Sequence, residues 1–341
     1  MSPDASTSQP EFIIAGCLTQ DYILPISGRP QINVLGGNLP YAAVGLNLWG
    51  KAAGMLARLG ANYSLSWLDR FRELGFDLAG IKVLPDEMDL RRFLAYPESR
   101  TVFTEDPVRH FADRGLAFPP ELLGYRSQGG EISSRTTPLK QSLQISDIPG
   151  SYLDATAVHI CPIDYLSHLL LPSIFRQGQA GTITLSPATG YMSPSFWEEI
   201  PGFLSDVTAF IVDEPEVAHL FQGRSSDLWE MADILASYGP EIILIRSLTS
   251  GYHLFDRVGE KRWIVPEYQI IVADPTGALD AFAGGFLGGY QTYLDPVEAA
   301  VRGAISASLV AEGSGVFYAL DAMPELVEGR LTALRELVRP A

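Results

Sequence analysis

Short apolar runs alternate with amphipathic stretches along most of the chain. Phe12 to Cys17 has the composition of a buried strand, and the pair Gly36 and Gly37 leads into a helical pattern from about Pro40 to Leu48. Beyond residue 150, strands are expected at Ala157 to Cys161, Gly181 to Leu185, Ala209 to Val212, Ile242 to Ile245, Tyr252 to Phe255 and Trp263 to Val265, and helices at Tyr165 to Arg176, Ser195 to Leu204, Glu214 to Phe221 and Leu228 to Ser237. This alternation predicts an α/β fold whose mostly parallel sheet is covered by helices on both faces.

The region between these two parts has a different pattern. Lys51 to Leu56 and Leu65 to Leu74 predict one more strand and one more helix, while Arg91 to Tyr96 and Thr101 to Thr104 alternate as a partly exposed hairpin would. Residues 107–149 are rich in Gly, Pro, Ser and Thr, which indicates a surface excursion. In open α/β sheets, ligands bind beyond the carboxyl ends of the strands. Asp21, which follows the first apolar run, is expected at or just beyond such an end.

Composition narrows the function. The chain has 24 basic and 40 acidic residues, a net charge of −16, which argues against nucleic-acid or anionic-membrane partners. Cys17 and Cys161 lie far apart without metal-binding spacing, so we expect buried thiols in a reduced compartment. The polar stretch 1–11 reads as a disordered leader, and we expect a cytoplasmic protein.

The stretch DPTGALDAFAGGF, from Asp274 to Phe286, contains the strongest chemical signal. A glycine turn opens directly into an apolar helix whose first turn contains Asp280. Helix starts have unpaired N–H groups and the positive end of the helix dipole, so they attract anions. One turn could therefore hold a phosphate and a general base together.

This stretch resembles the C-terminal signature DTTGAGDAF of the PfkB, or ribokinase-like, family of sugar and nucleoside kinases. Gly36 and Gly37, in LGGNLPYAA, resemble the family's N-terminal glycine pair, and VDEPE resembles its NxxE motif at Asp213 and Glu216. The resemblance implies a three-layer α/β/α kinase domain over residues 12–338, with a small β lid from about 20–36 and 90–105. In relatives the lid can also serve as a homodimer interface.

The resemblance implies a role for each matching residue. Asp280 would be the catalytic base, with the amides of Gly277, Ala278 and Leu279 binding the developing charge. Substrate would contact Asp21, Gly36, Gly37 and Tyr41, nucleotide would contact Arg246, Gly251, Thr276 and Gly277, and Asp213 and Glu216 would act on Mg²⁺ through water or phosphate. The implied cofactors are ATP and Mg²⁺, and the family's monovalent cation site admits K⁺.

Four residues depart from the family pattern. Leu279 replaces the glycine of GAGD, Asp213 and Tyr41 replace asparagines, and Leu248 replaces the first glycine of the nucleotide turn KxGxxG. The sequence favours an ATP-dependent kinase for a sugar hydroxyl. A nucleoside kinase and a catalytically impaired sugar- or nucleotide-binding member remain as alternatives.

Overall fold

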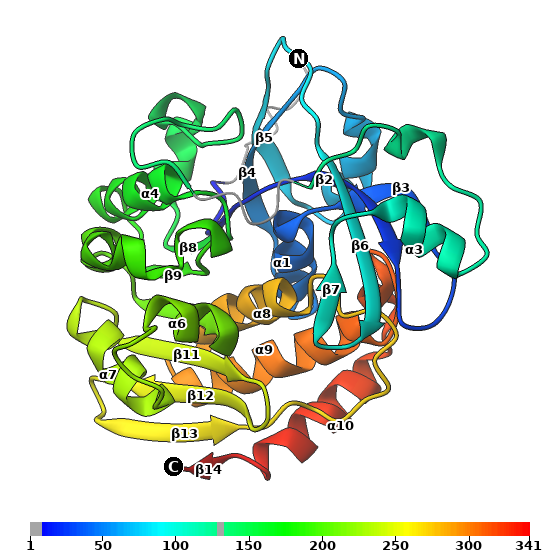
Figure 1. The fold of residues 1–341 in the computed structure, drawn as a ribbon. Coiled ribbons are helices and arrows are strands. Elements are labelled where there is room, and N and C mark those ends of the chain that lie inside the picture. Colours follow the sequence, from blue (N-terminus) through cyan, green and yellow to red (C-terminus); the bar gives the residue numbers. More distant parts are fainter. Residues whose placement is uncertain (1–8, 128–132) are drawn as a thin grey trace, which may run out of the picture.

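The computed structural model describes residues 9–127 and 133–341, and within these ranges the chain forms a large sheet between two helical layers, with a smaller sheet beside it (Figure 1). Most of the expected leader, 1–8, lies outside the described residues. The large sheet has the order β14-β13-β12-β11-β10-β9-β8-β1-β4-β5. Its strands are β1 (Phe12–Ala15), β4 (Ala53–Leu59), β5 (Asp77–Val83), β8 (Ala157–Ile160), β9 (Thr182–Leu185), β10 (Ala209–Asp213), β11 (Ile242–Ser247), β12 (Gly251–Asp256), β13 (Lys261–Val265) and β14 (Arg339–Pro340).

The pairings in this sheet are parallel from β5 through β11 and antiparallel from β11 to β14. The expectation of a mostly parallel sheet is therefore confirmed. The helices are α1 (Asn38–Asn47), α2 (Asp69–Glu73), α3 (Pro107–Asp113), α4 (Tyr165–Gln177), α5 (Ile200–Leu204), α6 (Glu214–Leu220), α7 (Leu228–Ser237), α8 (Ala278–Tyr293), α9 (Pro296–Ala311) and α10 (Pro324–Arg335). In the described part of the chain, no helix is both long and apolar enough to cross a membrane.

Successive residues of the buried strands point to opposite faces of the large sheet, so it has a core on each side. Phe12 and Ile14 pack with α1, α8 and α9, whereas Ile13 and Ala15 pack with α4, α5, α6 and α7. The burial of both faces explains why these strands read as continuous apolar runs in the sequence.

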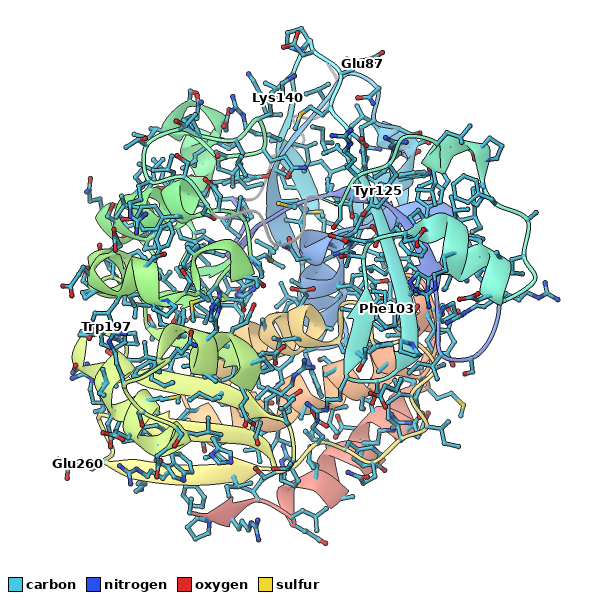
Figure 2. The ribbon with its side chains drawn as sticks, in the orientation of Figure 1. Glu87, Phe103, Tyr125, Lys140, Trp197 and Glu260 are labelled. Atoms are coloured by element: carbon cyan, nitrogen blue, oxygen red, sulfur yellow. The ribbon has the colours of Figure 1, made fainter. Side chains whose placement is uncertain are left out.

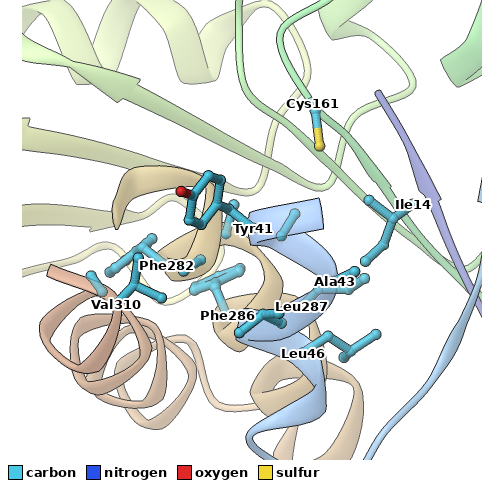
Figure 3. Close-up of a cluster of buried hydrophobic side chains, with 14 of the residues drawn as sticks. Ile14, Tyr41, Ala43, Leu46, Cys161, Phe282, Phe286, Leu287 and Val310 are labelled. Carbon is cyan, nitrogen blue, oxygen red and sulfur yellow. The ribbon is translucent and has the colours of Figure 1, made fainter. Parts of the chain in front are cut away.

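Small residues bring α1 and α8 unusually close. A Cβ at Gly284 would lie 1.9 Å from the carbonyl oxygen of Ala42, and one at Gly45 would lie 2.1 Å from that of Ala281. Figure 3 shows the resulting packing, with Tyr41 of α1 near the start of α8 and Phe286 further along that helix. These glycines therefore let the backbones of the two helices meet directly.

The smaller sheet has the order β3-β2-β6-β7, with strands β2 (Thr19–Leu24), β3 (Gln31–Gly36), β6 (Arg91–Glu98) and β7 (Thr101–Phe103). The β6–β7 hairpin was expected from the sequence. Phe103, the last residue of β7, is labelled in Figure 2. The β2–β3 turn is tied to the loop before α8, because the amides of Ile26 and Ser27 both donate to the carbonyl oxygen of Ala273. This sheet thus lies against the loop that holds the signature turn.

Several local features differ from the sequence-based expectations. Asp21 lies beyond β1, as expected. It is inside the strand β2, however, since β2 begins only four residues after β1 ends, and its side chain is fully buried. The stretch expected as one helix from Ser195 is a 3-10 segment, Pro194–Glu199, followed by α5. The strand β5 was not anticipated because its burial is irregular, and the surface excursion contains the helix α3.

Candidate active site

The start of α8 lies where the glycine turn predicted it. Gly277 is the residue before the helix and has φ 74°, a backbone conformation that side chains disfavour. A Cβ on it would also fall 2.0 Å from the ring of Tyr41, so only glycine fits between that ring and the helix. Within the turn, the amide of Ala278 donates to the carbonyl oxygen of Pro275 at 3.2 Å. One of the amides expected to face an anion is therefore engaged inside the turn.

Asp280 lies in the first turn of α8 and is partly buried. Burial raises the pKa of its carboxyl group to about 7; the guanidinium of Arg92 opposes the shift, Asp213 adds to it, and Arg246 opposes it. A carboxylate with a pKa near neutrality can accept a proton at physiological pH and still release it afterwards.

This pKa predicts the pH dependence of the reaction. If Asp280 must be ionised to act, kcat/KM falls about tenfold per pH unit below pH 7 and levels off above it. Replacing Arg92 by Gln removes the cation that lowers this pKa, so the midpoint of the profile moves to higher pH. Initial rates between pH 5.5 and 9 measure both effects. A midpoint that stays fixed in the Arg92 variant would contradict the assignment of the profile to Asp280.

Asp21 is bound by a guanidinium that the sequence did not reveal. Arg92 on β6 donates from Nε to Oδ1 of Asp21 at 3.0 Å and from Nη2 to Oδ2, and Thr19 Oγ1 donates to Oδ1 at 2.6 Å. Burial disfavours the charge of Arg92, but the adjacent carboxylate outweighs it and the pKa of Arg92 lies above its ordinary value. A Cβ on Gly36 would lie 1.9 Å from Cγ of Asp21, so this glycine gives the carboxylate its space. Gly37, with φ 104°, packs against the carbonyl oxygen of Cys17.

Two tyrosines lie near both this pair and the signature turn. Tyr41 is buried, and its hydroxyl has no hydrogen-bond partner among the described residues. Burial raises its pKa, and the carboxylates of Asp274 and Asp21 add to that shift. Thr276 Oγ1 donates to the hydroxyl of Tyr96, on β6, at 3.2 Å. The small sheet and the start of α8 therefore enclose one polar region that contains Asp21, Arg92 and Tyr41.

A second cluster lies at the neighbouring carboxyl ends of β10 and β11, where Asp213 and Arg246 are directly paired in register. Arg246 donates from Nε to Oδ1 of Asp213 at 2.6 Å and from Nη2 to Oδ2 at 2.8 Å. Asp213 also begins α6 in a capping box with Glu216. Burial raises the pKa of Glu216 to about 7, and the negative charge of Asp213 adds to this shift. A hydrogen bond that Thr189 Oγ1 donates to Glu216 at 2.7 Å opposes it. The added negative charge of Asp213 is thus balanced by Arg246.

The departures at Leu248 and Leu279 are also accommodated, and Gly251 of the nucleotide turn is a glycine for a steric reason. Leu248 is 46% exposed, and its amide donates to Glu214 at the start of α6 at 2.6 Å. Gly251 has φ 86°, and a Cβ there would lie 2.5 Å from the carbonyl oxygen of Val265, so it serves the tight β11–β12 turn. Leu279 packs against the core of α1, α8 and α9.

The ion pair of Asp213 and Arg246 predicts strongly non-additive effects of substitution. Asp213→Asn and Arg246→Gln should each lower the free energy of unfolding by about 2 kcal/mol, because each leaves a partly buried charge without its partner. The double variant should lose clearly less than the sum of the two. Urea denaturation of the four proteins measures the coupling. Additive losses would show that the pair contributes nothing beyond its separate side chains.

A cavity of about 170 Å³ opens beside this cluster and the start of α8. Its lining includes Arg246, Ala278 and Tyr252, together with alanines of α9. Of the residues expected to contact nucleotide, Arg246 lines the cavity, and Thr276 and Gly277 directly precede Ala278. Among the described residues, no group of three or more His, Cys, Asp or Glu side chains could hold a metal ion.

Residues 155–323 match the family described as pfkB family carbohydrate kinase. Residues 155–323 form a PfkB family carbohydrate kinase domain. This range contains Asp213, Arg246 and Asp280. The chain is accordingly a phosphotransferase with an alcohol group as acceptor.

The relatives extend the likeness over nearly the whole chain. A cytidine kinase of Thermococcus kodakarensis is 25% identical over 292 residues, which cover 86% of this chain and 92% of the relative. A Burkholderia thailandensis nucleoside kinase in complex with inosine shares 19% identity at a TM-score of 0.67, covering 95% of this chain and 98% of the other. A putative ribokinase II of E. coli in complex with ATP and Mg²⁺ shares 14% sequence identity at a TM-score of 0.69. This match covers 95% of this chain and 99% of the other. The fold of the PfkB domain and its N-terminal extension is therefore ribokinase-like.

Proposed function

We propose that this PfkB protein transfers the γ-phosphoryl group of ATP to a hydroxyl group on the ribose of a nucleoside. The observation that carries the proposal is Asp280, a carboxylate with a pKa of about 7 in the first turn of a glycine-initiated helix. The acceptor oxygen would attack the γ-phosphorus as its proton passes to Asp280. The bond from that phosphorus to the β-phosphate oxygen would break, and ADP would leave.

The binding roles follow from the two polar regions. Asp21, whose carboxylate occupies the room that Gly36 leaves, would accept hydrogen bonds from hydroxyls of the acceptor. The nucleotide would occupy the cavity beside Arg246, with its phosphates toward the amides of Gly277 and Leu279. The small sheet would act as a lid that keeps water from the reacting atoms.

The cations would come with the nucleotide or bind at the signature loop. Mg²⁺ would neutralise phosphate charge, with Asp213 and Glu216 acting through water or phosphate, because the described residues form no metal cluster of their own. K⁺ would suit Asp274, whose Oδ2 is buried without a hydrogen-bond partner in the described part of the chain. The carbonyl oxygen of Ala311, which accepts the amides of Ala273 and Asp274, lies at the same loop.

The relatives favour a nucleoside over a free sugar. The relative with 25% identity is a cytidine kinase, and one structural neighbour contains inosine. A free sugar is the second candidate, favoured by a Vibrio cholerae fructokinase with fructose and ADP, which has a TM-score of 0.68 at 14% identity over 95% of this chain and 99% of the other.

The four departures from the family pattern support an active enzyme over an impaired binding protein. Asp213 is neutralised by Arg246, Leu279 packs into the core and Leu248 faces solvent, so none of the three fills the space before Asp280. The fourth departure, Tyr41, is accommodated because its ring packs on Gly277, where any side chain would collide with it.

Acceptor-dependent ADP formation tests the proposal. Cytidine, uridine, adenosine, inosine, ribose and fructose would be compared with MgATP in a coupled assay, after thermal-shift measurements identify those that bind. We expect a nucleoside to give the highest kcat/KM. A higher value for ribose or fructose would select the sugar kinase, and binding without ADP formation across the panel would overturn the proposed reaction.

A further inference from the structure

Arg100 crosses from the small sheet to the large one. It lies in the turn between β6 and β7, whose tip reaches down beside α8 and the loop that follows β13 (Figure 1). Its Nη1 donates to the carbonyl oxygen of Ser247 at 3.2 Å, and its Nη2 donates to Oε2 of Glu267 at 2.9 Å. The hairpin tip is thus held at the edge of the nucleotide turn, next in sequence to Arg246.

Arg100 and Glu267 also line the cavity beside Arg246. Arg100 and Glu267 stand at its polar side, and alanines of α9, among them Ala304 and Ala307, form its apolar side. Its volume of about 170 Å³ is below the roughly 300–1,000 Å³ typical of pockets for small ligands. A nucleotide would thus extend beyond this volume through the open side of the cavity or displace part of its lining. The contacts of Arg100 are the ones that join two separate sheets there.

The two guanidinium groups of this cavity differ in how firmly they are held. Arg246 makes two hydrogen bonds to Asp213, and each side chain is 24% exposed. Arg100 contacts Glu267 through one nitrogen, and the side chains are 32% and 36% exposed. An ion pair so open to solvent is weak, whereas a guanidinium binds phosphate oxygens strongly and in pairs. Arg100 is therefore the cation that can change partners at low cost.

We propose that Arg100 is a nucleotide-phosphate contact delivered by the small sheet, and that Glu267 holds it until the nucleotide binds. This inference rests on the proposed function, since it takes the cavity as the nucleotide site. It also links the two substrates. The sheet that contributes Arg100 carries Asp21 and Arg92 at the acceptor site, so nucleotide binding would fix the position of the acceptor residues.

Calorimetry with MgADP on the intact protein tests this exchange. Arg100→Gln should weaken binding about tenfold, because a charged contact to phosphate is lost. Glu267→Gln should tighten it about threefold, because the competing carboxylate is gone. The double variant should bind like Arg100→Gln, since Glu267 acts only through Arg100. Arg109→Gln, on the neighbouring helix α3 and also paired with an exposed carboxylate, is the matched control and should bind like the wild type.

The outcomes separate this inference from the proposed function. If the wild type binds MgADP and Arg100→Gln binds equally well or more tightly, the role of Arg100 is overturned and the kinase proposal stands. Tighter binding by the double variant than by Arg100→Gln would likewise overturn it, because Glu267 would then act independently. If the wild type binds no nucleotide, both proposals fail. Thermal unfolding of each variant checks that these exposed substitutions leave the fold intact.

Discussion

Asp280→Asn should lower kcat by about a thousandfold while the protein still binds MgADP. Asparagine has the shape of aspartate but cannot take the proton of the attacking hydroxyl, and a positioned general base typically contributes about 10² to 10⁴ in rate. Steady-state rates with the best acceptor, and calorimetry with MgADP, measure the two quantities. A variant that keeps more than a tenth of the wild-type kcat would remove Asp280 from the mechanism.

The stability of the same variant provides an internal control. The pKa of Asp280 is about 7 in the folded protein and about 3.9 when unfolded, so its stabilising contribution is complete below about pH 4 and is lost as pH rises through 7. Asparagine has no charge to desolvate. At pH 8 the unfolding free energy of Asp280→Asn should therefore exceed that of the wild type by at most about 4 kcal/mol, and near pH 4 the two should be equal. A loss of activity together with this gain in stability excludes misfolding as the cause.

Gly36→Ala should lower kcat/KM for the acceptor at least a hundredfold and lower the melting temperature. The added Cβ would lie 1.9 Å from Cγ of Asp21, so the buried carboxylate must leave its bonds to Arg92 and Thr19. We estimate a loss of about 3 kcal/mol in unfolding free energy, in the range for breaking a buried charge pair. The assay with the best acceptor and thermal unfolding measure both effects.

Gly150→Ala is the matched control for this substitution. Gly150 does not have a positive φ, and a Cβ there meets nothing within 4 Å. It should keep wild-type activity and stability. Equal behaviour of the two alanine variants would contradict the view that Gly36 exists to make room for Asp21.

The sequence predicted what depends on local pattern. The runs at β8 to β11 could be predicted as strands because burial on both faces makes them mostly apolar, and the confirmed parallel core follows from the helices between them. The start of α8 was equally local, since Gly277 and Asp280 lie in one turn. The cytoplasmic location, the lid function and the dimer stay predictions.

The sequence could not predict contacts between distant segments. Arg92 binds Asp21 across 71 positions, and Arg246 binds Asp213 across 33, so only the fold brings them together. The one signal for Arg92 was its place directly before the apolar run Phe93 to Tyr96 in an expected strand. Asp213 looked like an unbalanced charge because its neutralising partner lies on the next strand. Arg100 gave no signal, because a turn arginine is ordinary until its contacts are known.

Identification of the reaction products tests the central claim most directly. The protein would be incubated with MgATP and the acceptor that stabilises it most, and the mixture analysed by mass spectrometry. The account predicts equal amounts of ADP and of acceptor bearing one phosphate on a hydroxyl, and neither product with Asp280→Asn. ADP accompanied only by inorganic phosphate, or the same products from the Asp280 variant at the wild-type rate, would contradict it.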